Sequence, residues 1–429
     1  MKFKFTFLLT FIFLFDKSFS QNSTIAFAIT GQSTANFNWA DIRIIDMNSG
    51  NTNATLFENG KTKFSFADAE TKQPVSQFIL SGKPTLIQSS IQISANKVII
   101  DSPSPTSLMS AAVAYDKRHD KVFFASMYTG QLMWLDLRSN MNTPAFYTVQ
   151  KMLVDHPNLN DESFNITRMT IGADGNGYAL TNDGNHLIRF TTGNKTVVTD
   201  MGALIDAESN NSISVHNQCS SWGGDMVADA FGKLYLLSAS RNVFIIDPQT
   251  RIATYKGAIG NLSATFTVNG AAVIDDNTVM VSSANTFEGF YKVDINKLAA
   301  TKINTQGKIY NASDLASCNL LHQQEKLNSV GKPSLTKLEV IGNRFISVYP
   351  NPVSNGQIRV TFDGSASGKY KVSVTDLQGR LIGAKDVYVK GPGQVETFQF
   401  NRKQASGMYM IKVVDATSKA IFSDKLMVE

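Results

Sequence analysis

The sequence predicts an all-β protein built from two folded parts behind a cleavable leader. Apolar residues occur in short alternating runs, bounded by Gly, Asn, Asp and Pro, without a sustained helical period. One pattern of such runs recurs several times before residue 321. A polar stretch then separates this repeat region from a C-terminal part with a different charge. These three observations carry the prediction of the fold class.

The length and composition set broad limits on the protein. The chain has 429 residues, 43% of them hydrophobic, which is enough for a buried core and excludes a mostly disordered protein. At about 150 residues per domain, this length allows two or three domains. The formal net charge is only +5, which does not predict a nucleic-acid-binding surface.

Residues 1–20 have the pattern of a secretory signal peptide. Lys2 and Lys4 precede the uncharged run Phe5–Phe15, and small residues follow it at Ser18 and Ser20. As a helix this run would be about 16 Å long, roughly half of a hydrocarbon core, so it is too short to span a membrane. We expect cleavage between Ser20 and Gln21. Because no longer apolar run follows, no transmembrane segment is expected in the mature chain.

Residues 21–321 contain an internal repeat that predicts their fold. Each copy has an apolar strand, a polar turn, a second strand, another turn and a third strand. The clearest copies are Ala112–Asn140, Met169–Asn194, Asp225–Thr250 and Ala271–Lys297. Their third strands end near Asp136, Phe190, Asp247 and Asp294, at intervals of 54, 57 and 47 residues. Repeats of this length made of short strands are typical of a β-propeller.

A further copy near the N-terminus bears on the number of blades. Phe37–Gly50 matches the end of the pattern, with Asp46 in the position of Asp136. The 90 residues between these two Asp leave room for two units, so we favour six blades and leave five or seven open. A β-sandwich is the alternative, but sandwiches do not repeat at this period. A ring must close, and we expect Gly307–Asn311 to pair with Thr24–Thr30.

An Asp recurs at the first turn of the repeats. The four residues are Asp116, Asp174, Asp229 and Asp275. Because Asp before a turn accepts a hydrogen bond from the backbone two residues on, the pattern predicts a structural role. The sequences around Asp174 and Asn182 also resemble oxygen-rich calcium loops, but they lack the twelve-residue spacing and the terminal Glu of a helix-loop-helix site.

The C-terminal part differs from the repeat region. Residues 322–344 are polar and without sustained period, and we interpret them as a linker. Residues 345–429 contain short alternating runs separated by turn residues, which predict a small Ig-like antiparallel β-sandwich. Residues 21–321 hold 22 Lys and Arg against 25 Asp and Glu, whereas residues 345–429 hold 11 against 7. This change in charge supports a domain boundary.

Three motifs in the C-terminal part are recognisable. Val348–Pro352 reads VYPNP, Asp376–Arg380 reads DLQGR, and Gly407–Tyr409 precedes an apolar strand. In this order they resemble the type A C-terminal sorting domain of proteins exported by the type IX secretion system of Bacteroidetes. The residues that carry the resemblance are Tyr349, Pro350, Asn351, Pro352, Gly379, Gly407 and Tyr409. The central repeats are similar to propeller domains found in front of this sorting domain.

The resemblance implies a route and a set of partners. The signal peptide would take the chain to the periplasm, and the C-terminal domain would then carry it through the outer membrane by the type IX translocon. A sorting peptidase would remove the domain, and the remainder would be released or joined to surface lipopolysaccharide. The expected location is the outer cell surface or the surrounding medium.

Two cysteines are present in a chain that is expected to be exported. Cys219 and Cys318 enclose about 100 residues, and we expect them to form a disulfide, since exported proteins meet oxidising conditions. Two free, buried cysteines are the alternative. Neither has a second Cys or a His at the spacing of a zinc site.

The sequence contains no recognisable catalytic arrangement. It lacks the GxSxG, HExxH and GxxxxGK[ST] motifs and the Asp box of sialidases. Ser214–Asp225 gathers His216, Trp222 and two glycines before a first strand, and we interpret this segment as structural, with ligand binding as the alternative. Six-bladed propeller hydrolases assemble carboxylates and Asn from separate blades around one cation. We therefore keep four candidate metal ligands, Asp174, Asn176, His216 and Asp225.

Three hypotheses for the function follow. The leading one is a secreted cell-surface propeller that binds an extracellular glycan or protein partner without catalysis. The second is a metal-dependent propeller hydrolase or lyase, similar to lactonases, which would use a divalent cation as its cofactor. The third is a structural protein of the cell envelope. The sequence itself requires no cofactor.

Overall fold

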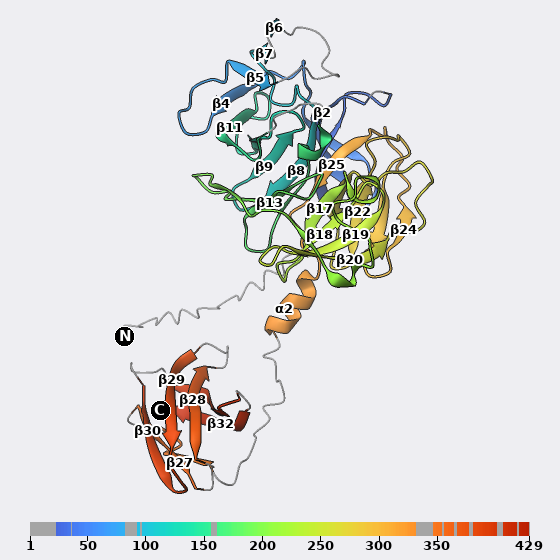
Figure 1. The fold of residues 1–429 in the computed structure, drawn as a ribbon. Coiled ribbons are helices and arrows are strands. Elements are labelled where there is room, and N and C mark those ends of the chain that lie inside the picture. The colour runs from blue at the N-terminus through green and yellow to red at the C-terminus, as the bar shows by residue number, and fades with distance from the viewer. Residues whose placement is uncertain are drawn as a thin grey trace, which may run out of the picture. The chain divides into compact units, whose positions relative to one another are not determined.

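A computed structural model describes most of the chain. The described residues are 23–35, 37–81, 92–94, 97–155, 161–331, 346–353, 356–363, 367–376, 381–400, 406–417 and 420–428. The expected signal peptide, its cleavage site at Ser20 and Gln21, and the motif residue Gly379 lie outside these ranges. The chain divides into two compact units, Met1–Gln324 and Glu325–Glu429. Both are built mainly of strands (Figure 1), which confirms the all-β prediction.

Five sheets form most of the described part of the first unit. Sheet 1 consists of β25 (Ala312–Ala316), β1 (Ile25–Gly31), β2 (Trp39–Asp46) and β3 (Thr52–Phe57). Sheet 2 consists of β8 (Ser110–Asp116), β9 (Lys121–Ser126), β10 (Gln131–Asp136), β11 (Ala145–Met152) and β4 (Ser65–Asp68). Sheet 3 consists of β12 (Ile166–Ile171), β13 (Gly177–Thr181), β14 (Leu187–Phe190) and β15 (Val198–Asp200).

Sheets 4 and 5 follow the same plan. Sheet 4 consists of β17 (Asp225–Ala228), β18 (Leu234–Leu237), β19 (Asn242–Asp247), β20 (Ile252–Ala258) and β16 (Ile205–Asp206). Sheet 5 consists of β21 (Gly270–Val273), β22 (Thr278–Ser282), β23 (Tyr291–Asp294) and β24 (Ala299–Lys302). Neighbouring strands in the five sheets are antiparallel except for β4–β11 and β16–β20. Each of the four clearest repeat copies thus supplies three consecutive strands of one sheet.

The first strand in each of these descriptions touches the corresponding strand of the next sheet. Strand β25 contacts β8, β8 contacts β12, β12 contacts β17, β17 contacts β21, and β21 contacts β25 again. Five apolar clusters lie between successive sheets in the same cyclic order. Examples are Phe27 with Phe124, Phe123 with Phe190, Leu187 with Phe244, Tyr235 with Val281, and Met280 with Leu315. The core is therefore divided among the sheet interfaces.

Sheet 1 joins the two ends of the repeat region. Strand β1 pairs with β25 in antiparallel register, Ala28 opposite Leu315, so the orange end of the repeat region lies beside its blue start in Figure 1. The sequence predicted this pairing for Gly307–Asn311, but the strand that pairs is Ala312–Ala316. Only Asn311 of the predicted segment takes part, through its carbonyl oxygen, which accepts from the Gly31 N–H.

Asn319 stabilises this junction. Its Oδ1 accepts from the Ser23 N–H at 2.8 Å, and its Nδ2 donates to the carbonyl oxygens of Ser23, Val273 and Ile274 at 2.8–3.1 Å. The side chain is buried. It therefore links the start of the folded chain to sheet 5 and to the segment after β25.

Asn319→Ala should lower the free energy of unfolding of residues 21–324 by about 1–3 kcal/mol, because it removes the partner of several buried backbone groups. Urea denaturation checks this value. Asn296→Ala, at an exposed turn, is the control and should change the free energy of unfolding by about 0.5 kcal/mol or less. An Asn319→Ala midpoint equal to that of the wild type would contradict the role in closure.

The segment between Asp46 and Asp136, where the sequence leaves room for two repeat units, does not form two such units in its described part. Its described residues contain β3, β4, a separate three-stranded sheet of β5 (Gln77–Ser81), β7 (Lys97–Asp101) and β6 (Gln92–Ser94), and three further strands of sheet 2, β8, β9 and β10. Strand β4 adds to the outer edge of sheet 2, parallel to β11. The described part of this segment thus holds one repeat copy, β8–β10, and an inserted small sheet, together with β3 and β4.

The helices of the described chain are short. They are the 3-10 turns Glu162–Phe164 and Glu208–Asn210, α1 (Gln218–Ser221) and α2 (Gln323–Gly331). Helix α2 lies in residues 322–344, which the sequence predicts to be a linker. None of these helices is long and apolar enough to cross a membrane.

The second unit contains two antiparallel sheets. One consists of β26 (Ile346–Tyr349), β27 (Gln357–Phe362) and β30 (Gln394–Gln399). The other, which we call the four-stranded sheet, consists of β29 (Leu381–Val389), β28 (Gly368–Asp376), β31 (Gly407–Asp415) and β32 (Ala420–Val428). Residues of both sheets, such as Val360 and Val374, belong to one buried cluster. This unit therefore has a core of its own.

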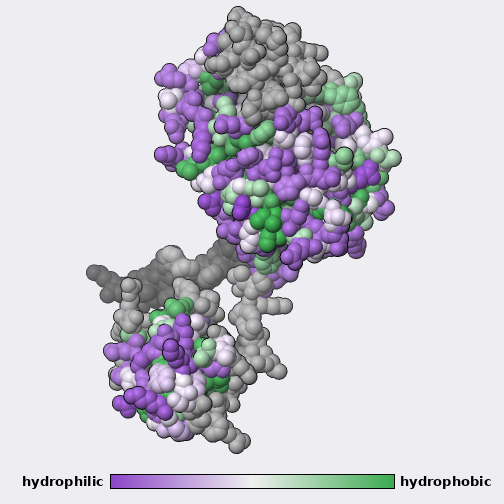
Figure 2. Space-filling view, in the orientation of Figure 1, coloured by the Kyte–Doolittle hydropathy of each residue, from purple (hydrophilic) through white to green (hydrophobic). Residues whose placement is uncertain are grey.

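The surface seen in Figure 2 is mostly hydrophilic over the first unit, with apolar residues in small separate groups. Exposed large apolar side chains are present in both units. Those of the described residues include Phe37, Val197, Ile205 and Phe231 in the first unit and Leu381, Tyr388, Val395 and Met427 in the second.

Candidate functional site

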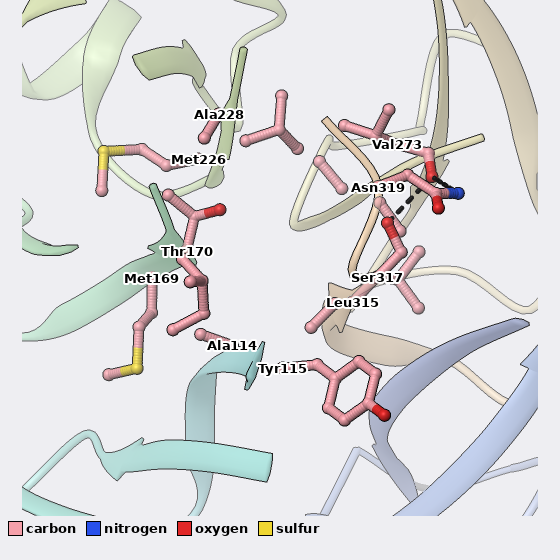
Figure 3. Close-up of a pocket in the computed structure, with 15 residues that line it drawn as sticks. Ala114, Tyr115, Met169, Thr170, Met226, Ala228, Val273, Leu315, Ser317 and Asn319 are labelled. Carbon is pink, nitrogen blue, oxygen red and sulfur yellow. Dashed lines mark hydrogen bonds between the residues drawn. The ribbon is translucent and has the colours of Figure 1, made fainter. Parts of the chain in front are cut away.

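Five strands, β25, β8, β12, β17 and β21, which we call the innermost strands, surround a narrow cavity. Met169, Thr170 and Met226 line it from one side, and Val273, Ser317 and Asn319 from the other (Figure 3). Small side chains such as Ala114 and Ala228 complete the wall. Its volume of about 10 Å³ is at the limit for a single water. The space between the sheets is thus almost filled by the protein itself.

A pair of fully buried carboxyl groups lies among the same strands. Asp225 on β17 and Asp314 on β25 are both 0% exposed, and their side chains are hydrogen-bonded to each other. Because two ionised carboxylates cannot share a hydrogen bond, at least one of them holds a proton. Asp225 also accepts from the Ala271 N–H at 2.7 Å, and Asp314 accepts from the Val113 N–H. The pair therefore joins β17, β25, β21 and β8.

Arg168 on β12 brings the fifth innermost strand into this group. It is fully buried and donates to the carbonyl oxygens of Thr181, Ser221 and Gly223. Burial lowers its pKa to about 9, against the opposing effects of Asp183 and Asp225, so it stays cationic at neutral pH. We refer to Arg168, Asp225 and Asp314 as the buried polar cluster.

The carboxyl pair should make the first unit less stable as the pH rises from about 4 to 7. Burial raises the pKa of Asp225 to about 7, and burial together with the charge of Asp225 raises the pKa of Asp314 well above its usual value. In the unfolded chain both groups titrate near ~3.9, so the folded chain binds more protons over this range. The stabilisation is full below the unfolded pKa and is lost as the pH rises through the folded values.

Asp314→Asn should therefore flatten the pH dependence of the free energy of unfolding by up to about 1.4 kcal/mol per pH unit. Urea denaturation of residues 21–324 at several pH values between about 4.5 and 7.5 measures the slope. Asp275→Asn, at an exposed turn, is the control and should keep the wild-type slope. Equal slopes for the wild type and Asp314→Asn would show that the pair does not hold the extra proton.

A wider pocket adjoins the narrow cavity and shares four lining residues with it, Tyr115, Ile171, Ser317 and Asn319. We call it the mouth pocket. Its volume is about 180 Å³, and its other walls come from the turn after β8, the turn after β12 and the segment after β25. Lys117, Arg118 and Cys318 contribute polar groups to it. It has room for one sugar ring or one side chain of a partner.

The charged groups of the mouth pocket are held in place. Burial would raise the pKa of Asp116, but hydrogen bonds from Thr192, His119 and the Arg118 backbone outweigh it and lower the pKa, so the carboxylate is ionised. His119 Nδ1 lies 2.6 Å from Asp116 Oδ2, and Arg118 donates to the carbonyl oxygen of Gly175. Burial, with a contribution from Cys318, raises the pKa of Tyr115 to about 12. The Tyr115 hydroxyl is therefore a hydrogen-bond donor at neutral pH.

The four candidate metal ligands do not meet in one site. Asp174 and Asn176 share a turn, where Asp174 accepts from the Asn176 backbone and side chain and from the Tyr178 hydroxyl. His216 contacts the carbonyl oxygens of Asp183 and Leu204, and Asp225 belongs to the buried polar cluster. Within the described ranges no three His, Cys, Asp or Glu side chains are grouped to hold a metal ion.

The turn Asp residues behave as the sequence predicted. Each accepts from the backbone N–H two residues further on, at 2.8–3.1 Å. The residues are Asp116, Asp174, Asp229 and Asp275. Asp46, Asp136, Asp247 and Asp294 make the same bond at the turn after the third strand.

The segment Ser214–Asp225 makes internal contacts. Trp222 Nε1 donates to the His216 carbonyl at 3.0 Å. Gly224 has φ +89°, and a Cβ there would lie 1.9 Å from the Leu237 carbonyl oxygen, so only glycine fits. The carbonyl oxygens of Ser221 and Gly223 accept from Arg168. Sequence reasoning missed Arg168 and Asp314, which no local motif marks.

The disulfide expected between Cys219 and Cys318 is absent from the structure, in which both cysteines are unbonded. Cys219 lies in α1, before β17 begins. Leu321, three residues after Cys318, lies at the other end of β17, where its N–H donates a hydrogen bond to the Ala228 carbonyl oxygen. A four-residue strand spans about 13 Å, and a disulfide requires Cα atoms within about 7 Å. The presence of two cysteines in the sequence therefore did not predict that they lie close together in the fold.

Most of the sorting motif lies at one end of the second unit. Tyr349 ends β26, and Pro350 and Pro352 follow it, both preceded by cis peptide bonds. Asn351 donates to the Lys425 carbonyl and accepts from the Met427 N–H, both at 2.8 Å. Gly407 begins β31, and Tyr409 is buried in the core of the unit. The motif thus ties the start of the unit to its last strand.

These features define a class of protein in which a larger all-β unit is followed by a separate C-terminal β module. Residues 347–429 match the family described as secretion system C-terminal sorting domain, and the C-terminal unit belongs to that family. The domain marks proteins that the type IX secretion system exports to the cell surface or extracellular space. This chain is therefore such an exported protein, and its sorting domain interacts with the secretion machinery.

Comparison with solved structures gives only distant similarities. PorZ of Porphyromonas gingivalis, a surface component of the type IX secretion system, is 12% identical over 94% of this chain and 51% of that chain, with a TM-score of 0.31. The chain thus spans about half the length of PorZ. A functionally unknown protein of Desulfotomaculum acetoxidans is 11% identical over 70% and 100%, with a TM-score of 0.37.

Virginiamycin B lyase of Staphylococcus aureus, in a catalytically inactive form, is 9% identical over 74% of this chain and 83% of that chain, with a TM-score of 0.27. No functionally curated protein matches the chain. Similarities of this size assign no activity to the first unit.

Proposed function

We propose that the chain is a cell-surface β-propeller of five blades that binds an extracellular glycan or protein partner at the mouth pocket. The sorting domain carries the first part of this proposal, since it places the first unit outside the cell. The cyclic contacts of the five innermost strands and the pairing of β1 with β25 support the propeller. Five sheets support five blades in place of the six that the repeat spacing favours.

The mouth pocket is the binding site in this proposal because the rest of the central space is filled. The narrow cavity between the innermost strands has a volume of only about 10 Å³, whereas the mouth pocket offers about 180 Å³. Its donors are the Tyr115 hydroxyl and the side chains of Lys117 and Arg118. Such donors match hydroxyl, carbonyl or carboxylate oxygens of a glycan or protein.

A pocket-filling variant tests the proposal. Ala173 is exposed and lines the mouth pocket, so Ala173→Trp should block it without disturbing the core. Fluorescently labelled residues 21–324 would be applied to an array of soluble glycans and to isolated envelope proteins. We expect saturable binding that Ala173→Trp weakens at least tenfold and that Ala264→Trp, at an exposed loop outside the pocket, leaves unchanged.

Two outcomes would overturn the proposal. One is the absence of binding to any glycan or envelope protein. The other is turnover of a small lactone or ester that a single Asp or His substitution abolishes, which would favour the hydrolase hypothesis. No observation within the described ranges favours that second function, since no three candidate ligands are grouped.

A further inference from the structure

The solvent face of the four-stranded sheet carries an uninterrupted row of lysines. Val372 and Val374 on β28, Ile411 on β31 and Leu426 on β32 are buried in the core. Because side chains alternate along a strand, residues between these positions point to the opposite face. Four lysines occupy such positions, and all are exposed. They are Lys369, Lys371, Lys412 and Lys425.

The strand register places these lysines along a diagonal. Lys369 and Lys371 are two residues apart on β28, about 7 Å. Lys412 lies opposite Ser373, and Lys425 lies opposite Met410, which itself pairs with Thr375. Each step from strand to strand therefore advances by two residues, a separation of about 8 Å. The four ammonium groups form a row on the order of 20 Å long, which we call the lysine row.

Little negative charge balances the lysine row. Asp386, opposite Lys371 on β29, is the one acidic residue among the described residues of this face. No salt bridge of these four lysines with a described residue is present, whereas Lys385, on the same sheet, pairs with Glu396 at 2.9 Å. Like charges held about 7–8 Å apart repel one another, and an oppositely charged partner relieves that repulsion.

One end of the lysine row lies in a hollow. Its volume is about 460 Å³, and it is lined by Lys369, Lys371, Tyr388 and Val414 and also by Asp386 and Asp415. Asp415 is engaged by the Thr417 N–H and hydroxyl. A hollow admits a protruding chain segment, whereas a planar lipid surface cannot enter it. The apolar side chains of Tyr388 and Val414 would contact the stems of such a segment.

We propose that the lysine row binds an extended acidic segment of a protein of the secretion machinery. At about 3.3 Å per residue, six or seven extended residues would follow the row from the hollow to Lys425. Carboxylates of that segment pair with the four ammonium groups, and the interaction weakens with salt because these groups are exposed. This interaction is independent of ligand binding at the mouth pocket.

Charge reversal in the full chain tests the proposal in a host that has a type IX secretion system. Lys371→Glu combined with Lys412→Glu should reduce the surface-displayed fraction at least tenfold, measured by protease accessibility on intact cells. The conservative double variant, Lys371→Arg with Lys412→Arg, should be displayed like the wild type because it keeps both positive charges. The matched control is Arg359→Glu with Lys390→Glu, which makes the same charge change at exposed positions outside the row and should leave display unchanged.

A second measurement uses purified residues 345–429, which have their own core. A fluorescent hexaglutamate peptide should bind, the double Glu variant should bind it at least tenfold more weakly, and a hexaserine peptide should not bind. Unfolding midpoints of the variants should match the wild type, since the four side chains are exposed. Equal display of the reversed and control variants would overturn the proposal. Binding to phosphatidylglycerol vesicles without binding to hexaglutamate would also overturn it, in favour of an anionic lipid surface.

Discussion

A chain that ends at Arg344 should accumulate in the periplasm, whereas the full chain should reach the cell surface or the medium. The truncation removes the whole sorting domain, residues 347–429, but none of the strands of the first unit. Because each unit has separate apolar clusters, the remaining unit should still fold. Cell fractionation and protease accessibility on intact cells measure the two pools.

The control for this experiment separates sorting from folding. The unfolding midpoint of the truncated chain should match the transition of the first unit in the full chain. A second control joins residues 345–429 to an unrelated periplasmic protein, which should then appear outside the cell. Undiminished surface display of the truncated chain would remove the sorting role of the domain.

Arg168→Met should destabilise the first unit by about 3–5 kcal/mol, which is enough to unfold a marginally stable unit. The substitution keeps the approximate length of the side chain but removes every donor. It leaves the carbonyl oxygens of Thr181, Ser221 and Gly223 buried without a donor from this side chain. It also removes the positive charge that faces Asp225. Urea denaturation of residues 21–324 measures the loss.

The matched control is Arg138→Met. Arg138 is 61% exposed and pairs with the part-exposed Asp136, so its loss should change the free energy of unfolding by about 0–1 kcal/mol. Similar values for the two substitutions would show that the buried polar cluster does not hold the innermost strands together.

Local patterns predicted much of this fold. The alternating runs in the four repeat copies became three-strand sequences in four sheets, and the Asp before each turn bonds its own backbone. The pairing of the two ends of the repeat region was expected from the need to close a ring, although the strand that pairs lies a few residues later. The motif around Tyr349–Pro352 identified the sorting domain. Apart from the ring closure, these features depend on residues that are close in sequence or on a strong motif.

Features that depend on distant residues were not predicted. The 90 residues between Asp46 and Asp136 favoured a sixth repeat, but β4 joined sheet 2 and β5–β7 formed a separate small sheet. Cys219 and Cys318 were expected to bond, yet β17 lies between them. Asp225 was a candidate metal ligand because of its neighbours in sequence, and its partner Asp314, 89 residues later, went unnoticed.

The sequence by itself determined the fold class, the hydrogen bonds of the Asp residues at the turns, and the export of this protein by the type IX secretion system. Strand periodicity, Asx turns and the sorting motif each depend on only a few neighbouring residues. Only the tertiary structure decided which side chains meet at the centre and which lie in a row on the four-stranded sheet. Asp225, Asp314 and Arg168 come together because three separate sheets place them side by side, and the lysine row depends on the register of β28, β31 and β32. Register and sheet order are set by packing across the whole unit, which no local pattern encodes.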